Sequence, residues 1–377
     1  MAEVGRDKGA IMKLYENELY REDITYVAQL ALPWEKLKDK SIMISGATGL
    51  IGSFLIDVLM YKNKVNDLNC MIYALGRNEK RAKERFEVYY LDELFCFIPY
   101  DINQPLNRND LGTVNYILHL ASNTHPMAYS MDPIGTVMTN IIGTQNMLEF
   151  AVAHHTTRCA FASSNEIYGE NRGDTEKFDE EYCGYINSNT MRAGYPESKR
   201  CGEALCQAYI RQKELDVVIP RLTRSYGPTL LESDTKALSQ FLKKGIQGED
   251  IVLKSQGTQY YSYTYMVDAV SGLLTVLLKG KCGEAYNIAD DASDIMLKDL
   301  ATIIAEYAGT KVVFEIPDEV EAVGYSKATK ARLESKKLQN LGWKAKYDID
   351  TGIKRTMQIL RKRSNYGKII NNINSGI

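Results

Sequence analysis

The chain has 377 residues, enough for one large domain or two interlocked ones whose cores need no disulfide or metal. Its composition, 45% hydrophobic and 25% charged, is that of an ordinary globular protein, and a formal net charge of −2 gives no reason to expect a nucleic-acid or membrane-surface partner. The seven cysteines form no C-x-x-C pair, so we expect reduced, mostly buried thiols rather than a disulfide framework.

Residues 1–40 precede the first predicted core strand and are expected to form a helical extension. Residues 1–23 mix acidic and basic side chains and lack the apolar stretch of a signal peptide. No apolar run in the chain approaches the ~20 residues needed to span a bilayer. These features predict a cytoplasmic protein.

Strand-like and helix-like segments alternate from residue 40 to residue 221. Short apolar runs predict buried parallel strands, and longer segments with one apolar face predict helices. The predicted strands are 40–45, 70–75, 115–121, 158–163 and 216–221, and the predicted helices are 52–61, 79–95, 136–154 and 196–213. The alternation predicts an α/β fold, a Rossmann-type doubly wound parallel sheet covered by helices on both faces.

After residue 228 the pattern loosens into loops and short helices, which predicts a smaller C-terminal lobe that closes over the substrate. We therefore expect three parts. They are the extension 1–40, a dinucleotide-binding domain of residues 41–222 with about 259–295, and a substrate-binding lobe of residues 223–258 and 296–377.

A glycine-spaced turn follows the first predicted strand. Gly46, Gly49 and Gly52 have the spacing G-x-x-G-x-x-G and stand between that strand and an apolar-faced helix. The first glycine permits a tight turn, the second lets backbone N–H groups approach phosphates, and the third lets the helix pack close to the strand. We predict that this turn holds the pyrophosphate of a dinucleotide cofactor. Further cofactor contacts are expected from Thr48, Leu50 and Ile51.

The adenosine end of this predicted site leaves NAD and NADP open. NAD enzymes usually carry an acid at the end of the second strand, whereas Arg77 follows that strand here. Arg77 either faces the 2′-phosphate of NADP, stacks on the adenine, or is exposed. Asp101 and Ile102, after a third strand region, either contact the adenine or form a turn at a strand end.

Tyr195 and Lys199 stand four residues apart and share one face of the predicted helix, which Pro196 opens. A free phenol has a pKa of about 10 and is a poor base at neutral pH. A neighbouring ammonium stabilises the phenolate, so we expect Lys199 to lower the pKa of Tyr195 toward the range of a general base. Lys199 is also suited to hold the nicotinamide ribose.

The chain resembles the extended short-chain dehydrogenase/reductase family of NAD-dependent nucleotide-sugar epimerases, dehydratases and decarboxylases over residues 40–356. The resemblance rests on the glycine turn, on the Tyr195–Lys199 pair and on several shorter motifs. These motifs are His119-Leu120-Ala121-Ser122, Thr139-Asn140 with Gly143-Thr144, Ser163 through Gly169, Arg221 through Pro228, Tyr265 with Asp268, and Leu341-Gly342-Trp343.

The resemblance implies a nucleotide-diphosphate sugar as substrate and a shared first step. In that step Tyr195 removes the proton of the sugar C4 hydroxyl while the C4 hydride passes to the nicotinamide. It also implies that Ser164 shares the substrate's hydrogen bond with Tyr195, and that Asn140 is a structural and proton-relay residue. Such a cycle is redox-neutral, which favours tightly held NAD, with NADP as the alternative. The residues expected near the nicotinamide half are Leu120, Ala121, Ser122 and Asn140.

The residues that follow Ser164 distinguish the branches of this family. In dTDP-glucose 4,6-dehydratases an Asp-Glu pair stands there, and the Asp donates a proton to the departing C6 hydroxyl. This chain has Asn165 and Glu166, and an amide donates no proton in that role at neutral pH. UDP-glucuronate decarboxylases are similar to this chain in a small polar residue before the Glu and in an Arg three positions before the Tyr, here Arg192. The resemblance therefore favours decarboxylation, with 4-epimerisation and an atypical 4,6-dehydration as alternatives.

One position departs from the family's pattern. Tyr261 stands where the family usually has an Arg that contacts the nucleotide diphosphate, and Arg224 stands in the motif 221–228. Either Arg224 or Lys236 takes over the phosphate or a sugar carboxylate, or both are surface cations. The predicted substrate-binding residues are Asn165, Glu166, Arg192, Arg224, Lys236 and Tyr261.

Two other classes of function fit the sequence less well than an enzyme of this family. A non-catalytic NAD(P)-binding regulator would be expected to lose Tyr195 or Lys199, and both are present. No metal site is expected, because the chain has no H-E-x-x-H motif and the adjacent His154 and His155 point to different helix faces.

Relatives in this family usually form homodimers through two helices of each subunit, so the resemblance implies a homodimer built on helices 136–154 and 196–213. The apolar residues on these helices either form the interface or face the sheet. They are Met147, Phe150 and Ala151 on the first helix and Ala204, Leu205 and Ala208 on the second.

Overall fold

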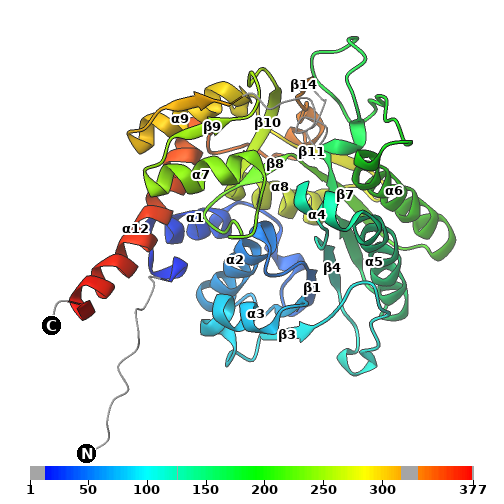
Figure 1. Cartoon of the computed structure of the whole chain (residues 1–377). Helices are drawn as coiled ribbons and strands as arrows, with labels where there is room; N and C mark the ends of the chain where they lie inside the picture. The colour runs from blue at the N-terminus through cyan, green and yellow to red at the C-terminus, as the bar shows by residue number, and fades with distance from the viewer. Residues whose placement is uncertain (1–12, 125, 316–329, 376–377) are drawn as a thin grey trace, which may run out of the picture.

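The computed structural model describes residues 13–124, 126–315 and 330–375, with the side chains of residues 126–128 and 364–375 excluded. Strands and helices alternate through its N-terminal part and enclose a central sheet (Figure 1). The strands of that sheet are β1 (Ser41–Ser45), β2 (Met71–Gly76), β3 (Phe95–Pro99), β4 (Tyr116–His119), β5 (Arg158–Phe161), β6 (Ser163–Ser164), β7 (Val217–Leu222) and β11 (Ala285–Ile288).

The central sheet is parallel throughout, in the order β11-β7-β5-β4-β1-β2-β3, with β6 paired to β7. The order reverses between β1 and β4, and in such sheets ligands bind beyond the carboxyl ends of the strands at that point. On one face lie α2 (Leu50–Asn66), α3 (Glu79–Phe86) and α8 (Met266–Lys279), and on the other lie α5 (Pro133–Ala153) and α6 (Gly194–Lys213) (Figure 1). The predicted Rossmann-type fold is confirmed.

A second sheet lies beside the first. It contains β10 (Tyr260–Tyr265), β12 (Asp294–Met296), β14 (Lys330–Ala331) and β8 (Arg224–Tyr226), which pairs with β10. A two-stranded sheet joins β9 (Ile251–Leu253) to β13 (Val312–Phe314). The helices of this region are α7 (Ala237–Gln247), α9 (Leu297–Ala308), α11 (Lys336–Gln339) and α12 (Ile349–Ser375), and α4 (Pro126–Met131) precedes α5. Because β8 continues almost directly from β7, the chain crosses from one sheet to the other within two residues.

The prediction of one long helix over residues 79–95 is wrong. The structure ends α3 at Phe86, continues with the 3-10 turn η3 (Glu87–Tyr89), and begins β3 at Phe95. The rings of Phe86 and Phe95 lie 5.3 Å apart, so the two ends of the predicted helix pack against each other across a reversal of the chain. Leu91, at 98% exposure, lies on the outside of that reversal. The other predicted strands and helices are present, with ends shifted by a few residues.

The described part of the N-terminal extension, residues 13–40, is helical and packs onto the body of the molecule, and residues 1–12 of the predicted extension lie outside the described residues. Its helix α1 (Glu18–Gln29) buries Asp23, whose carboxylate accepts hydrogen bonds from the hydroxyls of Tyr265 at 2.6 Å and Tyr347 at 3.0 Å and pairs with Arg355 at 2.8 Å. Burial raises the pKa of Asp23, and these three partners oppose the rise. One carboxylate thus joins the extension to β10 and α12.

The seven cysteines are free thiols, as predicted, but fewer are buried than expected. Cys70, Cys159 and Cys206 are buried, whereas Cys183 and Cys282 are exposed. None of the helices in the described ranges is both long and apolar enough to cross a membrane.

Candidate active site

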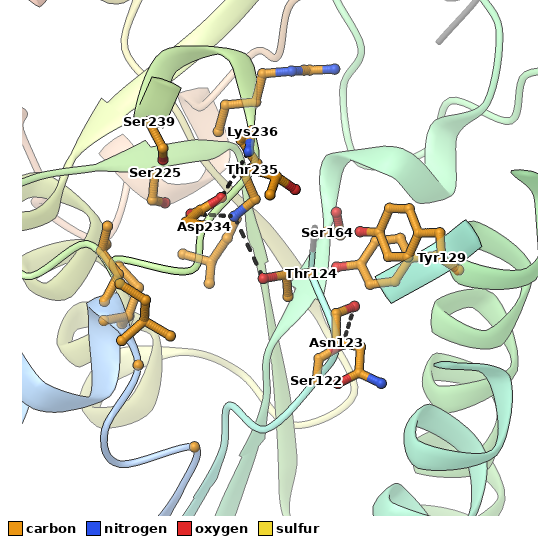
Figure 2. A pocket seen from close by; sticks show the side chains of 18 of the residues that line it. Ser122, Asn123, Thr124, Tyr129, Ser164, Ser225, Asp234, Thr235, Lys236 and Ser239 are labelled. Carbon is orange, nitrogen blue, oxygen red and sulfur yellow. Dashed lines mark hydrogen bonds and ion pairs between the residues drawn. The ribbon is translucent and has the colours of Figure 1, made fainter. Parts of the chain in front are cut away.

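A cavity of about 1830 Å³ runs from the carboxyl ends of β1, β2 and β4 to the second sheet. A pocket for one small ligand usually measures ~300–1,000 Å³, so this cavity has room for two ligands side by side. Of the predicted site residues, the cavity wall contains all but Asn140. Figure 2 shows Ser164 and Tyr129 on one side of it and Asp234, Lys236 and Ser239 on the other.

The close packing of the glycine turn leaves no room for side chains at Gly46 and Gly52, which is the geometry that a dinucleotide-binding turn requires. Gly46 has a φ of +70°, and a Cβ there would meet the backbone nitrogen of Ala121 at 2.9 Å. A Cβ on Gly52 would meet the carbonyl oxygen of Gly46 at 2.5 Å, so α2 packs directly against the turn. Gly49 is the N-cap of α2 and has no side chain to occupy the helix's first N–H groups. Those groups line the cavity, where a phosphate would accept their hydrogen bonds.

The strand-end loop that carries Leu120 and Ala121 is fixed by a serine that sequence reasoning did not select. The Ser45 hydroxyl accepts hydrogen bonds from the backbone N–H groups of Leu120 at 3.1 Å and Ala121 at 3.2 Å. It also hydrogen-bonds with Nδ1 of the buried His119 at 2.8 Å. Burial and the charge of Lys199 lower the pKa of His119 to about 3, so this imidazole is neutral.

The residues predicted for the adenosine end lie together at the rim of the cavity. Arg77 is exposed, directly after β2, and the carboxylate of Asp101 accepts a hydrogen bond from the backbone N–H of Asn103 at 3.0 Å. Ile102 is buried beneath them. Asp101 therefore shapes the turn after β3, and both it and Arg77 face the same end of the cavity.

Tyr195 lies at the start of α6, inside the cavity and 7% exposed. Burial raises the pKa of Tyr195, the nearby Glu166 carboxylate raises it further, and hydrogen bonding with the hydroxyls of Ser164 and Ser122 acts in the opposite direction. The net pKa of Tyr195 is therefore raised rather than lowered toward the range of a general base, because burial outweighs the favourable contacts. The ammonium of Lys199 donates to the carbonyl oxygen of Ala162 at 2.9 Å.

Lys199 is buried, and no carboxylate of the described residues forms an ion pair with it. The more distant charge of Glu203 raises its pKa only in part. Burial lowers the pKa of Lys199 to about 8. Its Nζ lies 4.9 Å from the centre of the Phe161 ring, which gives the cation an aromatic face on one side. Lys199 therefore places a positive charge at the cavity wall beside Tyr195 at neutral pH, and it loses this charge as the pH rises above about 8.

Asn140 differs from its predicted place among the cofactor contacts, because the structure puts it behind the cavity wall. It is completely buried; its Oδ1 accepts a hydrogen bond from Ser122 at 2.7 Å, and its Nδ2 donates to Ser198 at 2.9 Å. The Ser198 hydroxyl donates in turn to the carbonyl oxygen of Tyr195 at 2.8 Å. Asn140 thus fixes Ser122 relative to the start of α6.

Glu166 and Arg192 form a two-point ion pair beside Tyr195, with Nη2 donating to Oε1 at 2.9 Å and Nη1 lying 2.9 Å from Oε2. Arg192 also lies 5.0 Å above the ring of Tyr129, and Tyr129 stacks on Tyr195 with 5.1 Å between ring centres. Tyr129 was missed by sequence reasoning, since it lies on the short helix α4 with no motif around it. Asn165 is buried next to Glu166.

On the opposite wall Arg224 lies over the ring of Tyr261, with 3.6 Å from its guanidinium carbon to the ring centre. Lys236 is 3.6 Å from the carboxylate of Asp234 and reaches across to the hydroxyl of Thr124 at 3.5 Å (Figure 2). The structure therefore brings all six predicted substrate-binding residues to one cavity, three on each wall.

Comparison with known proteins agrees with this architecture. Residues 42–289 match the model of the NAD dependent epimerase/dehydratase family. The chain is 31% identical to UDP-glucuronic acid decarboxylase 1 of Xenopus tropicalis, over 86% of this chain and 72% of that protein. It is also 31% identical to UDP-glucuronic acid decarboxylase 3 of Arabidopsis thaliana, over 86% of this chain and 90% of that protein.

Solved structures share the fold at lower identity. A dTDP-glucose 4,6-dehydratase of Streptomyces venezuelae with NAD and TYD bound has a TM-score of 0.74 at 23% identity, covering 88% of this chain and 99% of its own. A UDP-glucuronic acid 4-epimerase of Bacillus cereus in complex with UDP-glucuronic acid and NAD has a TM-score of 0.73 at 20% identity, covering 85% and 99%. The resemblance inferred from the motifs is confirmed: the chain belongs to the NAD-dependent epimerase/dehydratase family, and NAD is its cofactor.

Proposed function

We propose that this protein is a nucleotide-sugar decarboxylase that acts on UDP-glucuronate through a transient 4-keto sugar. The observation that carries the proposal is the Arg192–Glu166 pair beside Tyr195, with the amide of Asn165 where a dehydratase would need an acid. The similarity to decarboxylases over most of both chains supports it. A 4-keto sugar with a C5 carboxylate is a β-keto acid, which loses carbon dioxide without an acid to assist a leaving group.

In this proposal each side chain of the site has a distinct role. Tyr195 accepts the proton of the C4 hydroxyl, while Ser164 and Ser122 hydrogen-bond with its phenol. The bound NAD supplies the hydride acceptor at C4. Glycines 46, 49 and 52 hold its pyrophosphate, and Lys199 contributes a positive charge that favours the phenolate of Tyr195. Arg192 lies on the same wall as Tyr195 and attracts the sugar's carboxylate.

Mass spectrometry of UDP-glucuronate incubated with the purified protein and NAD tests this proposal. A product lighter by one carbon dioxide is expected, and UDP-glucose, which has no carboxylate, should give no such loss. Tyr195→Phe, which keeps the ring and removes the ionisable hydroxyl, should lower the rate by a factor of ~10² or more. A substrate of unchanged mass would overturn decarboxylation.

The same experiment separates the alternative reactions. An isomer of unchanged mass would indicate a 4-epimerase, and a product lighter by one water would indicate a 4,6-dehydratase that works without the usual acid. If every nucleotide sugar of a panel is unchanged while NAD still binds, the protein is an NAD-binding regulator.

Three further features belong to this proposal. The dinucleotide-binding domain of residues 41–222 and 259–295 would hold NAD, and the lobe of residues 223–258 and 296–377 would hold the sugar nucleotide, with β10 pairing into the sheet of the lobe. The free thiols suit a cytoplasmic protein. The active form would be a homodimer that meets through the outer faces of α5 and α6.

A further inference from the structure

Three cationic side chains that are predicted to bind substrate line the cavity. They differ in whether a carboxylate of the protein already pairs with them. Arg192 forms a two-point ion pair with Glu166, and Lys236 lies 3.6 Å from the carboxylate of Asp234. Arg224 has no ion-pair partner among the residues that the structure describes. Of the three cations, Arg224 is therefore the one whose charge no described carboxylate neutralises.

The surroundings of Arg224 make this lack of a partner costly. Its Nη1 is buried and has no hydrogen-bond partner in the described structure. A buried guanidinium N–H that loses water without gaining an acceptor costs on the order of 1–3 kcal/mol, and more for a charged group. Stacking on Tyr261 fixes the plane of the guanidinium, and Arg224 lines the cavity, so that a planar or two-oxygen acceptor bound there is within its reach. A preorganised, unpaired guanidinium of this kind is a binding element for an anion.

The strand pairing sets the distance between Arg224 and the predicted sugar site at Ser164 and Tyr195. Ser164 of β6 lies opposite Leu222 of β7, and Arg224 follows two residues later, paired with Tyr263 of β10. Two residues of extended chain span ~7 Å, which is about the reach from a sugar's C4 hydroxyl across the ring to the phosphate on C1. A sugar whose C4 hydroxyl meets Ser164 and Tyr195 would therefore place the group on the far side of its ring, the C1 diphosphate, toward the second sheet and near Arg224.

We propose that Arg224, stacked on Tyr261, is the residue that binds the diphosphate of the nucleotide-sugar substrate, and that Lys236 and Arg192 do not serve this purpose. The inference rests on the proposed substrate class and goes beyond it by choosing one cation and one anion. It also explains how the chain functions with Tyr261 on β10, because the guanidinium comes from the adjacent strand β8 and lies over that tyrosine ring.

Calorimetric titration of the NAD-bound protein with nucleoside diphosphates tests the proposal without any turnover. UDP, dTDP, CDP and GDP are titrated into the wild type, and the tightest ligand is used for the variants. Arg224→Gln is expected to weaken that ligand about tenfold or more, because it removes the charge while keeping a planar polar end group. The swap Arg224→Gln with Tyr261→Arg, which delivers a guanidinium from β10 instead, is expected to recover most of the loss.

Lys244→Gln is the matched control, since Lys244 also lines the cavity and already lies 3.9 Å from the Glu249 carboxylate. Its affinity should stay within about twofold of the wild type. Thermal unfolding and NAD affinity are measured on each variant, so that a misfolded variant is recognised, and the swap then decides the question in a folded background.

The remaining outcomes oppose the proposal in separate ways. If Arg224→Gln leaves the diphosphate affinity unchanged but weakens UDP-glucuronate, the residue binds the sugar's carboxylate instead. If Lys236→Gln causes the loss that is expected of Arg224→Gln, the diphosphate belongs to Lys236. If no nucleoside diphosphate binds the wild type, the substrate class itself is wrong. Binding of UDP with no decarboxylation of UDP-glucuronate overturns only the proposed reaction and leaves this inference standing.

Discussion

We expect the charge state of Lys199 to limit the pH range over which the proposed catalytic pair, Tyr195 and Lys199, can work. Its pKa is lowered to about 8 by burial, so the ammonium is fully charged below that value and becomes neutral as the pH rises through it. A neutral lysine no longer favours the phenolate of Tyr195, whose own pKa is raised by burial. The two side chains therefore depend on each other.

We predict that the rate of carbon dioxide release falls above about pH 8, because Lys199 loses its charge there. A profile measured between about pH 6 and pH 10 at saturating NAD checks this. In Lys199→Arg, which stays charged throughout, activity should be lower but the decline above about pH 8 should disappear. A decline of the same midpoint in that variant would show that another group is responsible.

We expect Asn165 to determine which reaction the 4-keto sugar of the proposed substrate undergoes. It is 7% exposed, so an aspartate in its place would be strongly desolvated and its pKa raised, which suits a group that must donate a proton. We predict that Asn165→Asp gains 4,6-dehydratase activity on a nucleotide-activated glucose, by a factor of ~10² over the wild type. The product, lighter by one water, is detected by mass spectrometry.

Asn165→Leu is the control for this change, since leucine has a similar shape and no proton to donate. It should show no dehydration above the wild type. Equal activity in Asn165→Asp, Asn165→Leu and the wild type would exclude this position as the one that chooses between reactions.

At the scale of the elements, a buried carboxylate helps to join α1, a helix outside the central sheet, to the rest of the fold. Asp23 of α1 accepts hydrogen bonds from Tyr265 and Tyr347 and pairs with Arg355 of α12. Removing it would leave the Arg355 guanidinium, whose side chain is 14% exposed, with only the peripheral Glu22 as a counter-charge.

We predict that Asp23→Ala lowers the free energy of unfolding by ~3–5 kcal/mol, because it leaves a largely buried charge uncompensated. Urea unfolding followed by circular dichroism measures the change. Glu22→Ala is the matched control, since Glu22 is 55% exposed and contacts the same arginine; it should change stability by no more than ~0.5 kcal/mol. Equal effects of the two substitutions would mean that burial of Asp23 carries no special weight.

The elements also show where sequence reasoning succeeds and where it stops. The glycine turn and the Tyr195–Lys199 pair are local, and their spacing alone fixes which side chains share a turn or a helix face. The stack of Tyr129 on Tyr195 and the stack of Arg224 on Tyr261 join segments far apart in the chain, and no spacing encodes them. The boundary between α3 and β3 was missed for the same reason, since the contact of Phe86 with Phe95 exists only once the chain has turned.

At the scale of the whole molecule, α5 and α6 lie side by side on one face of the central sheet (Figure 1). Of the residues expected to form an interface on α5, Met147, Phe150 and Ala151 are buried in the protein's own core and so face the sheet. Ala204 and Ala208 on α6 are exposed, as an interface requires. On α5 the exposed apolar side chains are instead Ile134 at 77% and Met138 at 40%, one helical turn apart.

We predict that the protein is a dimer and that Met138→Asp converts it to a monomer, because a carboxylate at the centre of an apolar helix pair would be desolvated without a partner. Sedimentation equilibrium measures the mass of each form. Leu91→Asp is the control, since Leu91 is 98% exposed in the turn before β3, away from both helices, and should remain dimeric. A wild type that sediments as a monomer would exclude the dimer altogether, whereas loss of the dimer in Leu91→Asp would place the interface on the opposite face of the sheet.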